Sequence, residues 1–120
     1  MGNRNLEPFP RGILVADPSA STVYYSDPLE VGEARSLAVW FQVLASMPAN
    51  VVKPAEARVE TSNVLGFHGW LDLTPAGMSP DIGVVDAGVV EEPLRYVRVR
   101  VEVEAGEVPL LEFRMVAREG

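Results

Sequence analysis

His68 is the only histidine in the chain, and the chain contains no cysteine. A multi-histidine or thiolate metal site is therefore ruled out, and Ser-His or Cys-His catalysis is nearly excluded. The serines form no Gly-x-Ser-x-Gly motif, and neither a Gly-x-Gly-x-x-Gly motif nor a P-loop is present. The sequence therefore predicts a protein that is not an enzyme and uses no cofactor.

The aspartates lie mostly in predicted turns. Asp17 and Asp27 each precede a proline, and an Asp-Pro pair typically starts a turn. No EF-hand pattern is present, although a calcium ion held by loop carbonyl groups stays open as an alternative. No particular pair of carboxylates is marked as catalytic.

His68 lies in the segment GFHGW, which has two interpretations. In a binding loop, Trp70 or Phe67 would stack on a sugar ring, while His68, Asn63 or Asp81 would bond its hydroxyl groups. In a structural loop, the two aromatic side chains would instead fill the end of the core. The structural interpretation is favoured, because aromatic residues beside strand ends are usually buried.

The elements around this loop show the alternation of β-strands. In residues 94–104 (LRYVRVRVEVE), valines alternate with charged residues, as in a strand with one buried face. The same pattern predicts strands at 55–62 and 108–118, and a tight hairpin turn at 105–107 that pairs 94–104 with 108–118. Cross-strand ion pairs would then join the charged faces of these two strands. Shorter strands are expected at residues 12–16, 21–26, 70–73, 82–85 and 89–90.

Residues 34–46 form the longest apolar run, with apolar side chains on both faces. A helix fits the spacing of some of them, but the β-branched and aromatic content favours a strand. Such a strand is central in a sandwich or covered by a partner. We therefore expect Trp40 and Leu44 to be buried; exposure of Trp40 would instead mark an interface. Residues 1–11, which include Phe9, are expected to form an N-terminal arm that contacts a neighbour, or else an edge segment of the sandwich.

These patterns predict an all-β chain that forms a single antiparallel β-sandwich, jelly-roll-like, with about eight strands and almost no helix. Residues 12–120 would form the sandwich domain, a size that suits one core. The net charge of −7 disfavours nucleic-acid binding. The sequence offers no basic membrane-binding face, no apolar run that could span a membrane and no signal peptide.

Two segments resemble the discoidin-like, or galactose-binding-like, β-sandwich family. One is VETSN at 59–63 followed by WLDL at 70–73, and the other is RYVRV at 95–99. Similar short sandwiches appear among small virion proteins of tailed phages. The resemblance covers about residues 55–104 and implies a sandwich that serves in structure or binding. The chain departs from the family in its shorter length, its lack of cysteine and its apolar loop VLGFH at 64–68.

Two functions follow from these observations. The leading hypothesis is a non-enzymatic structural protein of a phage or phage-like particle, associated with the capsid or tail. It would form a homo-oligomer or bind other protein subunits, in a virion or a cytoplasmic assembly, with Phe9, Trp40 and Leu44 at the interface. The alternative is a carbohydrate-binding module of discoidin-like type, whose glycan site would be the loop at residues 63–70 together with the loop around Met78.

Overall fold

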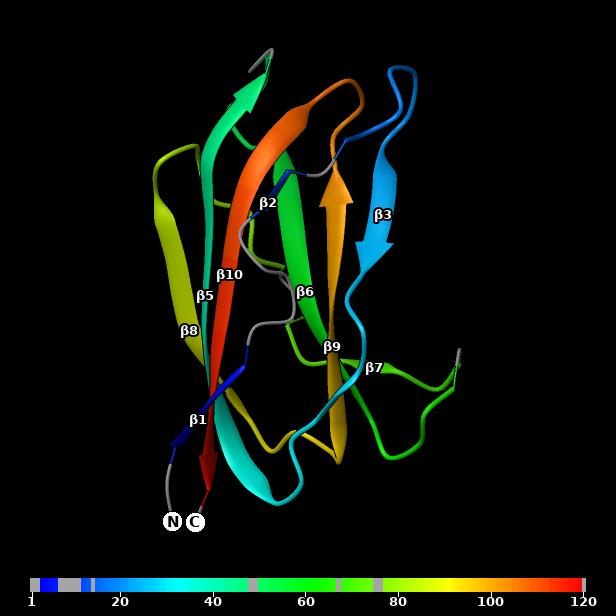
Figure 1. The fold of residues 1–120 in the computed structure, drawn as a ribbon, viewed down its shortest axis with the longest axis vertical. Coiled ribbons are helices and arrows are strands. Elements are labelled where there is room, and N and C mark those ends of the chain that lie inside the picture. The colour runs from blue at the N-terminus through cyan, green and yellow to red at the C-terminus, as the bar shows by residue number, and fades with distance from the viewer. Residues whose placement is uncertain are drawn as a thin grey trace.

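The computed structural model describes residues 3–6, 12–13, 15–47, 50–66, 68–74 and 77–119. Within them the chain forms ten β-strands and no helix (Figure 1). The strands are β1 (Asn3–Leu6), β2 (Gly12–Ile13), β3 (Thr22–Tyr25), β4 (Leu29–Glu30), β5 (Ala34–Met47), β6 (Ala55–Ser62), β7 (Leu71–Asp72), β8 (Val85–Glu91), β9 (Tyr96–Val103) and β10 (Val108–Glu119). The predicted all-β class is confirmed.

The strands form two antiparallel sheets that pack face to face, as the predicted sandwich requires. Sheet A has the order β1-β10-β5-β8, with β2 also paired to β10. Sheet B has the order β3-β9-β6-β7, with β4 also paired to β9. From β5 onward the chain passes repeatedly between the sheets, as in a jelly roll, and β8 lies at the free edge of sheet A (olive in Figure 1).

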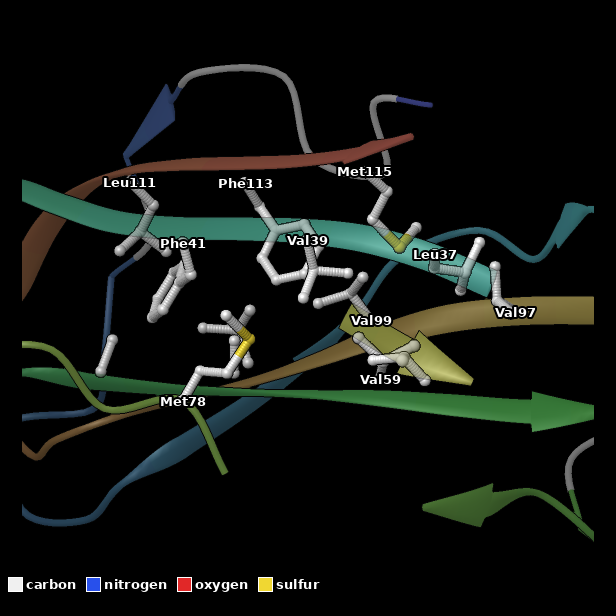
Figure 2. Packing of buried hydrophobic residues seen from close by; sticks show 14 of the residues in the cluster. Leu37, Val39, Phe41, Val59, Met78, Val97, Val99, Leu111, Phe113 and Met115 are labelled. Atoms are coloured by element: carbon white, nitrogen blue, oxygen red, sulfur yellow. The ribbon is translucent and has the colours of Figure 1, made fainter. Parts of the chain in front are cut away.

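The core lies between the sheets and is filled by the alternating apolar residues of the long strands. Leu111, Phe113 and Met115 on β10 point from sheet A toward Val59 and Val99 on sheet B (Figure 2). The rings of Phe41 and Phe113 pack with their centroids 5.8 Å apart. The inward faces predicted for residues 55–62, 94–104 and 108–118 are therefore confirmed.

The predicted hairpin between residues 94–104 and 108–118 is wrong. Residues 105–106 do form a turn, but β9 belongs to sheet B and β10 to sheet A, so the two strands do not pair. Their charged faces point to opposite sides of the sandwich, and the expected ion pairs between them do not form. Alternation shows which face of a strand is buried, but it does not identify the strand beside it.

The region around β8 also differs from the prediction. Two short strands were expected at 82–85 and 89–90, yet residues 85–91 form one continuous strand paired with β5. The Asp86-Ala87-Gly88 segment continues the strand because pairing with β5 satisfies its backbone groups. Residues 34–47 form a strand rather than a helix, as predicted.

The first described segment of the chain is part of sheet A. Strand β1 pairs with β10 in register from Asn3 opposite Arg118 to Leu6 opposite Met115. Leu6 packs against the core cluster. Part of the predicted N-terminal arm is thus an edge strand of its own sandwich. The rest of that arm, including Phe9, lies outside the described residues.

Candidate functional site

The predicted binding loop is only partly assembled by the fold. Asn63 and His68 are exposed, and the Asn63 side-chain oxygen accepts a hydrogen bond from the Arg95 backbone N–H at 3.3 Å. The Trp70 indole N–H donates to the Gly66 carbonyl oxygen at 2.7 Å, which closes the loop on itself. Phe67 lies outside the described residues, so its predicted role stays a prediction.

Asp81 is not near this loop. Its carboxylate forms an ion pair with Lys53 at 2.9 Å, and the neighbouring Ile82 N–H bonds the Val52 carbonyl. Residues 53–54 lie beside the end of β9, where the Glu104 N–H bonds the Pro54 carbonyl, whereas Asn63 lies at the start of β9. The eight residues of β9 separate the two places by about 25 Å. The structure therefore does not bring Asp81 to a common site with Asn63.

Trp70 does not fill the end of the core, contrary to the favoured interpretation. It lies half-buried on the outer face of sheet B, and the Arg98 guanidinium carbon lies 4.5 Å from its ring centre. The same guanidinium lies 4.3 Å from the ring centre of Tyr25. Arg98 also forms a 2.7 Å ion pair with Glu60, and both side chains are largely shielded, at 14% and 15% exposure. Trp70 is thus already occupied by an intramolecular cation–π contact.

The rest of this face is also paired internally. Arg58 bonds both Glu56 and Asp72 at 2.7 Å. Partial burial alone would raise the pKa of Asp72, but hydrogen bonds from Arg58 and the Thr74 N–H outweigh it and hold that pKa below its ordinary value. The hydrogen bonds to Asp72 and Glu56 raise the pKa of Arg58 in turn. The charged side chains discussed on the outer face of sheet B are therefore paired with one another, which leaves few of them available to bind a ligand.

The outer face of sheet A has the opposite character. Its β8 strand presents Val85, Ala87 and Val89 to solvent, with Val85 51% and Val89 53% exposed. The register places Ala87 beside Trp40 and Val89 beside Ala38 on β5. These residues form an apolar row, which we call the β8–β5 row: the exposed Val85, Ala87, Val89 and Trp40, together with Ala38, which is itself buried. Such a row on the surface typically marks a binding surface.

A groove of about 490 Å³ runs across the same face. It is lined by Asn5, Leu6, Trp40, Gln42, Val85, Glu112, Arg114, Met115 and Val116. Trp40 lies directly opposite Arg114 in the β5–β10 register, and Arg114 forms a 2.9 Å ion pair with Glu112. The groove thus combines one exposed aromatic side chain with amide, carboxylate and guanidinium groups.

The burial predicted for Trp40 and Leu44 is wrong. Trp40 is 39% exposed and Leu44 is half-buried, because no further layer among the described residues covers the outward positions of β5. The assignment of Trp40 to an interface stays a prediction. No pattern in the sequence groups Gln42, Glu112 and Arg114 with Trp40, since Glu112 and Arg114 come from a strand whose pairing with residues 34–46 the alternation did not identify. Their outward positions in the alternation were the available clue.

Other classes of site find no support in the described part of the chain. Among those residues no group of three or more His, Asp or Glu side chains is placed to hold a metal ion. The described segments also contain no helix of the length and apolarity needed to cross a bilayer.

No protein-family model and no curated protein matches the chain. Solved structures with the same fold include the Bacillus endospore appendages described as disulfide-linked pili, with a TM-score of 0.53, 10% identity, and coverage of 99% of this chain and 88% of that chain. TmCBM61, a carbohydrate-binding module solved with β-1,4-galactotriose, has a TM-score of 0.52, 12% identity, and coverage of 98% and 82%. A chain of infectious bursal disease virus, Gx strain, has a TM-score of 0.51, 9% identity, and coverage of 96% of this chain but 31% of its own. At such low identity these likenesses show the β-sandwich fold alone.

Proposed function

We propose that this protein is a non-enzymatic structural subunit that assembles with copies of itself through the outer face of sheet A. The observation that carries the proposal is the contrast between the two outer faces. On sheet B the charged and aromatic side chains are paired with one another, and the exposed Val23 and Tyr25 lie on the short edge strand β3. On sheet A, Trp40 and the valines of β8 are exposed. Tryptophan is enriched at the energetic centres of protein interfaces, and Trp40 borders the apolar side chains of β8.

The assembly that we propose is a phage or phage-like particle. The sequence supports a compact, cysteine-free sandwich with no catalytic motif, which suits a subunit whose role is to pack. The same fold occurs in an endospore pilus and in a virus chain, so it is compatible with assembly in both settings. The acidic charge argues that its contacts are with protein rather than with nucleic acid.

Light scattering after size-exclusion chromatography tests this proposal. We expect the mass of the wild-type protein to rise above that of the monomer at micromolar concentration. Trp40→Gln should weaken association by about thirtyfold, because truncating an interface tryptophan typically costs about 2 kcal/mol or more. Val64→Gln is the control, since Val64 is also apolar and is more exposed, at 62%, but lies in a loop outside sheet A. A wild-type protein that remains monomeric at all concentrations would overturn the proposal.

A second candidate, glycan binding, is favoured by one specific observation. The groove places Asn5, Gln42, Glu112 and Arg114 around the exposed Trp40. An aromatic platform with polar groups at its rim is the chemistry that holds a sugar ring and its hydroxyls. This site differs from the loop at 63–70 expected from the sequence, where Trp70 is already covered by Arg98.

Calorimetric titration with oligosaccharides, including β-1,4-galactotriose, separates the two functions. If the groove binds glycans, Trp40→Ala removes the binding and Trp70→Ala retains it. Loss of binding in Trp70→Ala alone would return the site to the 63–70 loop. An absence of binding by the wild-type protein, together with concentration-dependent assembly, would favour the structural subunit.

A further inference from the structure

The free edge of sheet A differs from the other sheet edges among the described strands. The strands β1, β2, β3, β4 and β7 are two to four residues long, whereas β8 has seven. Folded proteins usually keep edge strands short or protect them with charge, proline or a bulge, because unpaired backbone groups recruit other strands. Strand β8 is therefore the edge most able to accept a strand from another molecule.

Strand β8 carries few of the usual protective features. It contains no proline, lysine or arginine, and only Asp86 and Glu91 are charged. Its outward side chains are the exposed Val85, Ala87 and Val89, followed by the exposed Glu91 at the end of the strand. A cleft of about 270 Å³ lies between β8 and residues 73–74 and 77–78 of the neighbouring loop. Within the described segments, no backbone hydrogen bond joins β8 to that loop.

The outward apolar residues of β8 have a symmetric order along the strand, which suits pairing with a second copy of β8. Val85, Ala87 and Val89 are arranged symmetrically about Ala87. An antiparallel copy related by a two-fold axis at Ala87 would place Val85 opposite Val89, and Val84 opposite Val90. Such cross-strand apolar pairs stabilise a sheet. A two-fold interface requires a self-complementary surface of this kind.

Gly88 gives independent support, because the isolated chain does not require glycine there. Its φ is not in the left-handed region, and a Cβ added to it would meet nothing within 4 Å. Glycine inside a strand costs about 0.5–1 kcal/mol and often marks the close approach of another group. In the two-fold register Gly88 faces Asp86 of the second copy, and its missing side chain leaves room for that carboxylate. No carboxylate then faces another directly.

We propose that β8 pairs antiparallel with β8 of a second copy, joining the two A sheets into one continuous sheet. This proposal deepens the proposed function, on which it rests. The β8–β5 rows of the two copies would become one apolar surface, with Trp40 still exposed on each side for further contacts. Because each copy carries a net charge of −7, the copies repel at low ionic strength, and salt should strengthen the dimer.

Lysine substitution on the edge strand tests the pairing. Val89→Lys places a charge opposite Val85 of the second copy and should weaken the dimer by on the order of tenfold or more. Val23→Lys is the matched control, because Val23 is an exposed outward valine on the edge strand β3 of sheet B. Sedimentation equilibrium at two salt concentrations measures both. Equal dimerisation of the two variants would overturn the proposal.

A cysteine cross-link tests the register without relying on affinity. The chain has no cysteine, so Ala87→Cys introduces a single thiol. Directly opposed residues in an antiparallel pair have Cα atoms about 4.5–5.5 Å apart, which a disulfide can bridge. We expect mild oxidation to convert Ala87→Cys to a covalent dimer, and the exposed turn variant Ala20→Cys to remain largely monomeric. Equal cross-linking of Ala87→Cys and Ala20→Cys would overturn the β8 pairing. In that case a loss of assembly in Trp40→Gln would still support the proposed function.

Discussion

Replacing Arg98 with methionine is expected to lower the free energy of unfolding by about 3 kcal/mol, although Arg98 lies on an outer face. Its guanidinium contacts two rings, Tyr25 at 4.3 Å and Trp70 at 4.5 Å. Partly desolvated cation–π contacts are worth about 1 kcal/mol each. The substitution also leaves the Glu60 carboxylate, whose side chain is 15% exposed, without its 2.7 Å partner, which adds about 1 kcal/mol or more.

Urea unfolding followed by far-UV circular dichroism measures this loss. Arg95→Met is the control, because the Arg95–Glu30 pair is longer, at 3.4 Å, and more than half exposed on both sides, and because its contact with the Tyr96 ring is longer, at 5.3 Å. It should cost no more than about 1 kcal/mol. Adding Glu60→Gln to the Arg98 variant should restore about 1 kcal/mol, since the shielded charge is removed. The reasoning fails if the Arg98 and Arg95 variants unfold at the same urea concentration.

Two further perturbations test the core and the charge network. Phe113→Ala removes a ring that is 2% exposed and packed on Phe41. It should lower the free energy of unfolding, measured in urea, by about 3–5 kcal/mol. Val116→Ala, at a half-buried position on the opposite face of the same strand, should lower it by about 1 kcal/mol. The pKa of Asp72 is lowered in the folded state. Asp72 therefore contributes fully to the free energy of unfolding above its ordinary pKa of about 3.9, and this contribution is lost as the pH falls through the lowered pKa. Asp72→Asn should therefore cost about 1 kcal/mol at pH 7 and show a shallower loss of stability below about pH 4; a parallel loss in both proteins would contradict the assignment.

The sequence predicted the layers of the fold better than its connections. Period-two alternation in 55–62, 94–104 and 108–118 identified which side chains face the core, because that pattern follows directly from strand geometry. It could not show that the turn at 105–107 carries the chain from one sheet to the other. A turn motif fixes the local backbone, whereas strand partners are decided by packing across the whole sandwich.

The candidate site was predicted less completely, for a related reason. Trp40 was recognised as the residue that would mark an interface if exposed, but its exposure depends on the absence of a covering layer, which no local pattern reports. Asp86 and Gly88 resemble a turn in the sequence. They are tolerated in β8 because inward positions on an edge strand lie beyond the densest part of the core. The surroundings of Trp40 come from three other strands and required the register.

Iodide quenching of Trp40 fluorescence tests most directly whether the outer face of sheet A is buried on assembly. The chain has two tryptophans, so Trp70→Phe leaves Trp40 as the sole reporter while keeping an aromatic ring beside Arg98. We predict that quenching is strong in the monomer and in the β8-paired dimer, where Trp40 stays exposed, and that it falls as the mass measured by light scattering rises above that of the dimer. An assembly larger than the dimer in which Trp40 remains as accessible to iodide as in the monomer would contradict the account.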